Sequence, residues 1–97
     1  MFAVIFRARI KQLDSEYSEL AERLRRLAIE EFGCIDFIAM TEDNRELAIS
    51  YWHSEEDIHR WKQAAEHLHA QANGKQKWYE SYEVQIARIC RTYGSRE

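Results

Sequence analysis

The order in which hydrophobic periodicity changes along the chain restricts its fold more than any other feature. Residues Phe2 to Lys11 alternate with a period of two, which is typical of a β-strand with one wholly apolar face. From Tyr17 to Phe32 the apolar residues recur every three or four positions, which predicts an amphipathic helix. Asp14 or Ser15 is the expected N-cap of that helix, and Gly33 is its expected C-cap.

A hairpin and a second helix follow. Cys34–Thr41 is a short β-rich run, and the polar turn Glu42–Arg45 separates it from an alternating run at Glu46–Trp52. Ser54 begins a capping-box pattern, with acidic residues at the positive end of a helix that we expect to continue to Ala72.

The last segment returns to strand character. Asn73 and Gly74 are expected to end the second helix, Lys75–Glu80 to form a turn or short helix, and Tyr82–Thr92 to form the final strand. The order β-α-β-β-α-β predicts an α+β, ferredoxin-like fold in which a four-stranded antiparallel sheet carries two helices on one face. We expect residues 1–97 to form a single domain.

Two helices cover only one face of such a sheet. The first, second and last predicted strands carry large apolar residues on both faces, and a chain of 97 residues buries a limited core. Burial of the second face against a twin subunit would remove this apolar surface from water. The sequence therefore predicts a homodimer.

Composition excludes several classes of partner. The 14 basic residues are scattered among 17 acidic ones, so the chain lacks the electrostatic footprint of a nucleic-acid-binding protein. The N-terminal apolar run is too short for a membrane span and lacks the layout of a signal peptide, so we expect a cytoplasmic protein without a membrane partner. Cys34 and Cys90 belong to no metal-binding motif, and we interpret them as buried free thiols, with a disulfide or a reactive thiol as the alternatives.

Candidate site residues gather between Ala48 and Tyr82, a stretch that holds all three tryptophans and all four histidines. Trp61 and Trp78 are candidates for stacking against a flat ligand, while Tyr51 and Tyr82 are candidates for hydrogen bonds to a phenol or quinone oxygen. Filling of an ordinary core is the alternative role for these rings.

The histidines give no metal signal, because none of their spacings places two ligands on one helical face with a third nearby. His53 and His59 are expected to be exposed. On an unbroken second helix, His67 points away from the apolar stripe and His69 lies at the edge of that stripe.

Three linked segments carry a family resemblance: ISYWHSEEDIHRW, AAEHLHAQ and GKQKWYESYEVQIARICR. The chain resembles the antibiotic biosynthesis monooxygenase-like family of small dimeric α+β-barrel proteins, over nearly its whole length and most strongly from Ile49 to Arg91. The resemblance implies the same fold, dimerisation through the sheets, and a pocket between sheet and helices. Related sequences often carry a break before the position of His67, and a bend after Gln63 would turn His67 inward.

The resemblance implies a cofactor-independent monooxygenase that oxidises a small aromatic or quinol-type compound with dioxygen, without a metal or flavin. In this hypothesis His67 is the catalytic base, because a histidine has a pKa near neutrality. The alternative is a non-catalytic dimeric module that binds a small apolar ligand. Haem-degrading members have a histidine where this chain has Gln71, and an asparagine in the first strand that this chain lacks.

Overall fold

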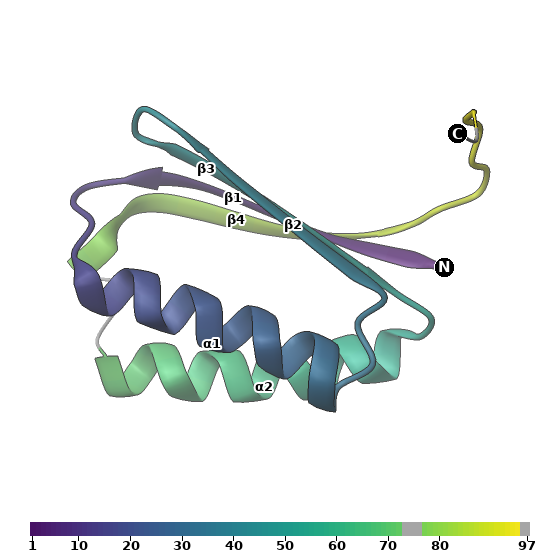
Figure 1. Ribbon diagram of the computed structural model, residues 1–97, viewed down its shortest axis with the longest axis horizontal. Coiled ribbons are helices and arrows are strands. Elements are labelled where there is room, and N and C mark those ends of the chain that lie inside the picture. The colour runs from purple at the N-terminus through teal and green to yellow at the C-terminus, as the bar shows by residue number, and fades with distance from the viewer. Residues whose placement is uncertain (73–76, 96–97) are drawn as a thin grey trace.

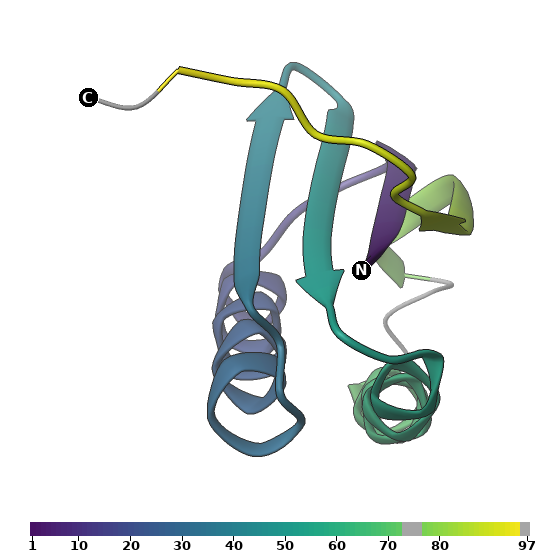
Figure 2. The same cartoon turned by 90° about the vertical axis from the view of Figure 1, so that its right-hand side faces the viewer.

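The computed structural model describes residues 1–72 and 77–95. It consists of one four-stranded antiparallel sheet and two helices, which both lie on the same side of the sheet (Figures 1 and 2). The elements follow one another in the order β1 (Phe2–Ile10), α1 (Ser15–Glu31), β2 (Asp36–Glu42), β3 (Arg45–Trp52), α2 (Glu55–Ala72) and β4 (Tyr79–Arg88). The predicted element order and ferredoxin-like fold are confirmed.

The strand order in the sheet is β2-β3-β1-β4, so β1 lies between β3 and β4. Phe6 on β1 is opposite Ala48 on β3 and Val84 on β4. Since alternate residues of a strand point to opposite faces, the even-numbered residues of β1 face the helices together with their cross-strand partners. Val4, Ala8 and Ile10 are buried on this face.

Both helix starts agree with the sequence prediction. The Asp14 side chain accepts a hydrogen bond from the Tyr17 backbone N–H at 2.8 Å, and the Ser54 hydroxyl accepts one from the Asp57 N–H at 3.2 Å. After α1, Gly33 adopts a φ of +85°, a left-handed conformation that favours glycine.

The hairpin is shifted slightly from its predicted position. β2 begins at Asp36 because Cys34 is still part of the helix end, where its backbone N–H donates to the Ala28 carbonyl oxygen at 2.9 Å. The turn is reduced to two residues, and Asp43 has a positive φ of 54°.

The prediction for the last strand was wrong at both ends. β4 already begins at Tyr79, which pairs with Ile10 after a register shift in β1. It ends at Arg88 because its partner β1 begins at Phe2 and leaves later residues without a neighbouring strand. Cys90 therefore lies beyond the sheet and is exposed, whereas Cys34 is buried as predicted.

Residues just before β4 are partly described. Lys77 and Trp78 are helical, in agreement with a short helical element in this region. The predictions for residues 73–76 lie outside the described residues.

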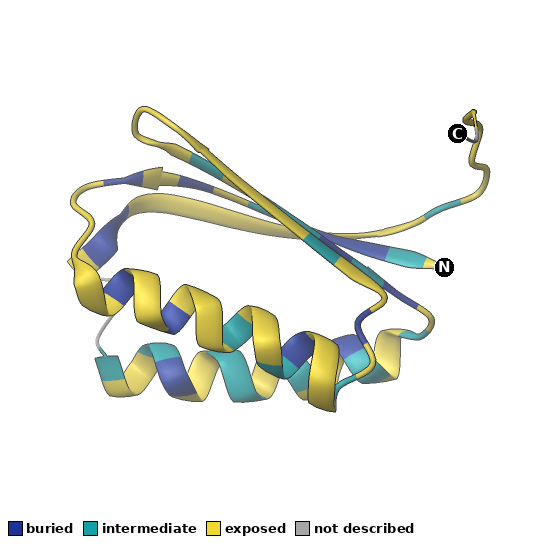
Figure 3. Cartoon of the chain, viewed as in Figure 1, coloured by how far each residue is buried: buried dark blue, intermediate teal, exposed yellow. Residues whose placement is uncertain are grey.

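The core lies between the sheet and the helices and has two clusters. Figure 3 marks the buried positions on the ribbon. One cluster contains Ala8, Tyr17, Leu20, Leu68, Trp78 and Tyr79. The other contains Val4, Ala28, Cys34, Trp52 and Ile58. Aromatic rings thus occupy both ends of the interior.

The helix-free sheet face carries exposed apolar side chains. Met40 is 67% exposed, and Ile38 and Leu47 are also exposed on this face. The chain therefore exposes apolar side chains on the sheet face that the two helices do not cover, as predicted. Among the described residues, no helix combines the length and the apolar character needed to cross a membrane.

Candidate functional site

A cavity of about 510 Å³ lies between the helix-facing side of the sheet and the two helices. Its wall is mainly apolar, with Phe6, Leu24, Phe37, Ile58, Trp61 and Val84 among its members. Cavities of this size and character hold small organic ligands in many proteins.

The cavity lining extends along both the helices and the strands. Its α2 wall includes Trp61 and His69, eight residues apart, which corresponds to about 12 Å along a helix. Its β3 wall includes Glu46 and Ser50, four residues apart, or about 13 Å along a strand. This length suits a fused-ring compound better than a single ring.

Trp61 forms the aromatic end of the cavity. Its ring lies 5.5 Å from that of Trp52 and 6.1 Å from that of Phe37, and its indole N–H donates to the Leu24 carbonyl oxygen at 3.1 Å. The ring is half-buried and lines the cavity, so one part of its surface is available to a ligand.

The opposite end of the cavity is polar. The Tyr17 hydroxyl from α1 donates a hydrogen bond to Oε2 of Glu46 on β3. The Tyr79 ring lies 6.2 Å from that of Tyr17, and the His69 ring from α2 packs 6.2 Å from that of Tyr79. We call these four residues, all of which line the cavity, the polar end.

Burial dominates the electrostatics of the polar end. It raises the pKa of the Glu46 carboxyl, and the hydrogen bond from Tyr17 offsets only part of this effect. Burial also raises the pKa values of the Tyr17 and Tyr79 phenols, and the nearby Glu46 adds to both increases. Both tyrosines are therefore neutral, and Glu46 is a stronger base than an ordinary carboxylate.

Charged side chains from the helices line another part of the cavity. Glu22 and Arg25 come from α1, and Lys62 and Glu66 come from α2. All four are exposed and contribute to the lining. These residues are a second place at which a polar group of a ligand can bind.

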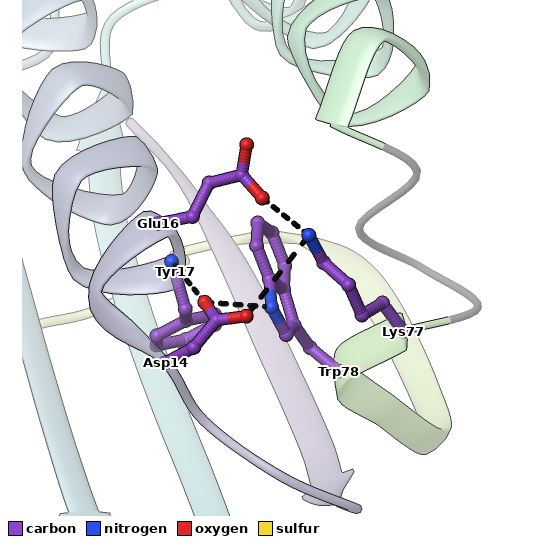
Figure 4. A network of polar contacts seen from close by, with 5 residues as sticks. All are labelled: Asp14, Glu16, Tyr17, Lys77 and Trp78. Carbon is purple, nitrogen blue, oxygen red and sulfur yellow. Dashed lines mark hydrogen bonds and ion pairs between the residues drawn. The ribbon is translucent and has the colours of Figure 1, made fainter.

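Trp78, a predicted stacking residue, does not line the cavity. Its side chain is fully buried, with an exposed fraction of 0%, and its indole N–H donates to Oδ1 of Asp14 at 3.0 Å. Figure 4 shows Trp78 next to Asp14, while Lys77 forms ion pairs with Asp14 and Glu16. Trp78 is therefore a core residue that joins the start of α1 to the start of β4.

The two candidate tyrosines have different positions. Tyr51 lies between Ser50 and Trp52, which are both buried on the helix side, so its own side chain faces the other side of the sheet. Tyr82 is opposite Ala8 on the helix side and lines the cavity, with 44% of its surface exposed. Only Trp61 and Tyr82 among the four predicted ligand-binding residues are brought together at the cavity.

His67 lies outside the cavity. α2 is one continuous helix from Glu55 to Ala72, and His67 is exposed on it. His69 is the histidine that lines the cavity, in agreement with its position at the edge of the apolar stripe on an unbroken helix. His53 and His59 are exposed, as predicted.

The sequence interpretation missed Tyr17, Glu46 and Tyr79. Tyr17 belongs to the apolar stripe predicted for the first helix, and Glu46 is the first residue of the predicted alternating run Glu46–Trp52. Period-two alternation places Glu46 on the same face as Ala48 and Ser50, which was a usable signal. The sequence predicts a turn or short helix at Tyr79, because it places the start of the last strand at Tyr82 instead of Tyr79.

The described residues contain no group of three or more histidine, cysteine or acidic side chains arranged to hold a metal ion. Gln71 occupies the place where the haem-degrading pattern requires a histidine, and it is exposed on α2 outside the cavity lining. Residues of this chain therefore do not fit the haem-ligand pattern.

Comparison with known proteins adds family information. The family model described as antibiotic biosynthesis monooxygenase matches residues 1–73. An uncharacterised protein of Bacillus subtilis, YqjZ, is 37% identical over 91 residues, which cover 93% of this chain and 80% of the relative. A jasmonate monooxygenase of Pyricularia oryzae is 31% identical over 102 residues, covering 100% of this chain but only 47% of that relative.

A solved structure agrees with the fold. A variant of SnoaB, a cofactor-independent oxygenase from Streptomyces nogalater, superposes with a TM-score of 0.76 at 13% identity, over 97% of each chain. At this identity the similarity supports the fold alone.

Proposed function

Because the chain belongs to the antibiotic biosynthesis monooxygenase family, we propose that it is a cofactor-independent monooxygenase that oxidises a small aromatic or quinol-type compound with dioxygen. The observation that carries this proposal is the apolar cavity with one aromatic and one polar end. The jasmonate monooxygenase among the similar proteins supports the reaction class.

The chemistry balances without an external reductant when a phenol is converted to a quinone. One atom of dioxygen enters the product as the second carbonyl oxygen, and the other leaves as water. The substrate supplies all the electrons, and its deprotonated form transfers the first of them to dioxygen. Such a reaction requires an apolar pocket, a base and an oriented ring, which are features that side chains alone can supply.

Trp61 and Tyr82 are the residues that we propose to contact the ring of the substrate. Trp61 offers a half-buried aromatic surface, and Tyr82 lies across the cavity with its ring 6.1 Å from that of Phe6. His69 takes the place of His67 as the histidine in reach of the ligand. Tyr51 and Trp78 have no ligand role in this proposal.

We also propose that the protein is a homodimer whose helix-free sheet faces pack together. The exposed side chains of Ile38, Met40 and Leu47 support this arrangement, because contact with a second copy would remove them from water. Tyr51 projects from the same face and would then be part of the interface.

Oxygen uptake tests the reaction. Purified protein, checked by absorption for the absence of flavin and haem, is incubated with phenols and quinols of one, two and three rings. We expect uptake with a fused-ring compound, with one quinone formed for each dioxygen consumed. Uptake should fall at least tenfold in His69→Ala, because this side chain helps to orient the ligand at the polar end, and stay within twofold in His67→Ala, with His59→Ala as the control on the same helix.

Two results would contradict the proposal. Absence of uptake with every compound, together with tight binding of one of them, would assign the chain to the alternative class of non-catalytic ligand-binding modules. A loss of uptake in His67→Ala, with His69→Ala unchanged, would restore the base predicted from the sequence.

A further inference from the structure

Glu46 is a half-buried ionisable residue of the cavity lining that the proposed reaction has not yet used. It points from β3 toward the helices, and its cross-strand neighbour on β1 is the buried residue Ala8. An anionic side chain in such surroundings loses hydration, which makes its protonated form more favourable than in water. A purely structural partner for the Tyr17 hydroxyl would not need a charge.

The carboxyl group is held in one orientation. Its Oε2 accepts the hydrogen bond from the buried Tyr17 hydroxyl. A carboxylate has two oxygens, each with lone pairs, so this bond leaves acceptor capacity for a ligand. Tyr17 itself is fixed from two sides, because its ring makes edge contacts with Trp78 at 5.2 Å and Tyr79 at 6.2 Å.

We propose that Glu46 is the general base of this site, that Tyr17 is its positioning residue, and that the substrate carries an acidic hydroxyl at this end of the cavity. This inference rests on the proposed function, because it assigns the base of that reaction. A hydroxyl at Glu46 places the rest of the ligand toward Trp61, which lies about 12 Å along α2 from His69 of the polar end. The substrate class is therefore a fused-ring phenol bound lengthwise.

The proton transfer is a single balanced step. The O–H bond of the substrate breaks, a new O–H bond forms on the Glu46 carboxylate, and the electron pair stays on the substrate oxygen. The negative charge thus moves from the protein to the ligand. A carboxylate with a raised pKa accepts this proton more readily than an ordinary one.

Titratable groups from each neighbouring element face Glu46. Tyr17 comes from α1 and Tyr79 from the start of β4, and His69 packs against Tyr79 from α2. The hydrogen bond from Tyr17 stabilises the carboxylate and so lowers its pKa relative to burial alone. Removal of the Tyr17 hydroxyl should therefore raise the pKa of Glu46 further.

A probe reaction without dioxygen isolates the base. The probe 5-nitrobenzisoxazole opens when a base removes its ring C–H proton: the N–O bond breaks, a nitrile forms, and the released phenolate absorbs visible light. Carboxylates in apolar pockets accelerate this reaction because they are poorly hydrated. The full chain is assayed under nitrogen across a pH series, next to Glu46→Gln, which keeps an acceptor for Tyr17.

We expect the wild-type rate to rise with pH through the titration of Glu46, and the rate to fall by about 100-fold or more in Glu46→Gln. Glu42→Gln, which changes an exposed acid at the end of β2, should keep the wild-type rate. Tyr17→Phe should move the rise of the pH profile to higher pH. Thermal unfolding of each variant, together with calorimetric binding of 2-hydroxyanthraquinone, confirms that the cavity is intact.

A rate in folded Glu46→Gln equal to that of the wild type, or no rate above buffer in either protein, would overturn the assignment of the base. An unshifted pH profile in Tyr17→Phe would overturn the positioning role. Because the probe consumes no dioxygen, a catalytic Glu46 combined with no oxygen uptake would reject the oxygenase reaction alone.

Discussion

Asp14 and Glu46 are two carboxylates that share one neighbour and have opposite properties. Asp14 accepts the backbone N–H of Tyr17 and the indole N–H of Trp78, and these bonds lower its pKa. Among the described residues, the Tyr17 hydroxyl is the hydrogen-bond donor to the Glu46 side chain. Burial raises the pKa of Glu46. Tyr17, near the start of α1, thus donates to both carboxyl groups. Asp14 is a stable anion, whereas Glu46 can act as a base.

The tryptophans near these two regions differ in the same way. Trp78 fills the interior beside Asp14 completely, whereas Trp61 leaves part of its ring facing the cavity. A filled region contributes stability, and an incompletely filled one provides a place for a ligand. Substitutions in the two regions should therefore affect different measurements.

The largest expected effect is on stability, from Trp78→Ala. Loss of a fully buried indole removes packing against Tyr17 and leaves a cavity, so the free energy of unfolding should fall by about 3–5 kcal/mol. Urea denaturation measures this change. A fall of less than about 1 kcal/mol, within the range of a surface substitution, would show that Trp78 is not a core residue.

Trp61→Ala should mainly affect ligand binding. Loss of the exposed ring surface should weaken binding of 2-hydroxyanthraquinone by about tenfold or more, which corresponds to roughly 1.4 kcal/mol. Titration calorimetry measures the affinity, and Leu13→Ala, at an exposed position before α1, is the control. Unchanged affinity in a folded Trp61→Ala protein would remove Trp61 from the ligand wall.

The carboxyl groups of Asp14 and Glu46 should make the free energy of unfolding depend on pH in opposite directions. Asp14 has a lowered pKa, so its contribution is present above its ordinary value of 3.8 and is lost as the pH falls through the folded value. Glu46 has a raised pKa, so its contribution is present below its ordinary value of 4.5 and is lost as the pH rises through the folded value.

Thermal unfolding across the acidic and neutral range measures these effects, which are the smallest of those predicted. The advantage of the wild type over Asp14→Asn should shrink as the pH falls. The stability of Glu46→Gln relative to the wild type should increase as the pH rises. Parallel curves for Glu46→Gln and the wild type would show that the pKa of Glu46 is not raised.

Sequence periodicity was sufficient for the fold because apolar residues recur at regular spacings along the helices and strands. The caps at Asp14 and Ser54 and the alternation of β1 depend on neighbouring residues, so they can be read locally. The end of β4 depends on where β1 begins, which is a tertiary constraint that local pattern does not contain.

The site was less accessible to sequence analysis. Trp61 and Trp78 look alike as aromatic residues near the second helix, and only packing distinguishes a cavity wall from a filled core. The pair of Tyr17 and Glu46 is separated by 29 positions, so their contact required the sheet to be assembled. His69 could be identified from the sequence, because helical geometry places it nearer the apolar stripe than His67.

A crystal structure of the protein with 2-hydroxyanthraquinone would test the central claim most directly. We expect the fused rings to lie against Trp61 and the hydroxyl oxygen to lie within about 3 Å of a Glu46 carboxylate oxygen. A ligand hydroxyl bound at Arg25 or Lys62, with Glu46 out of reach, would contradict the account.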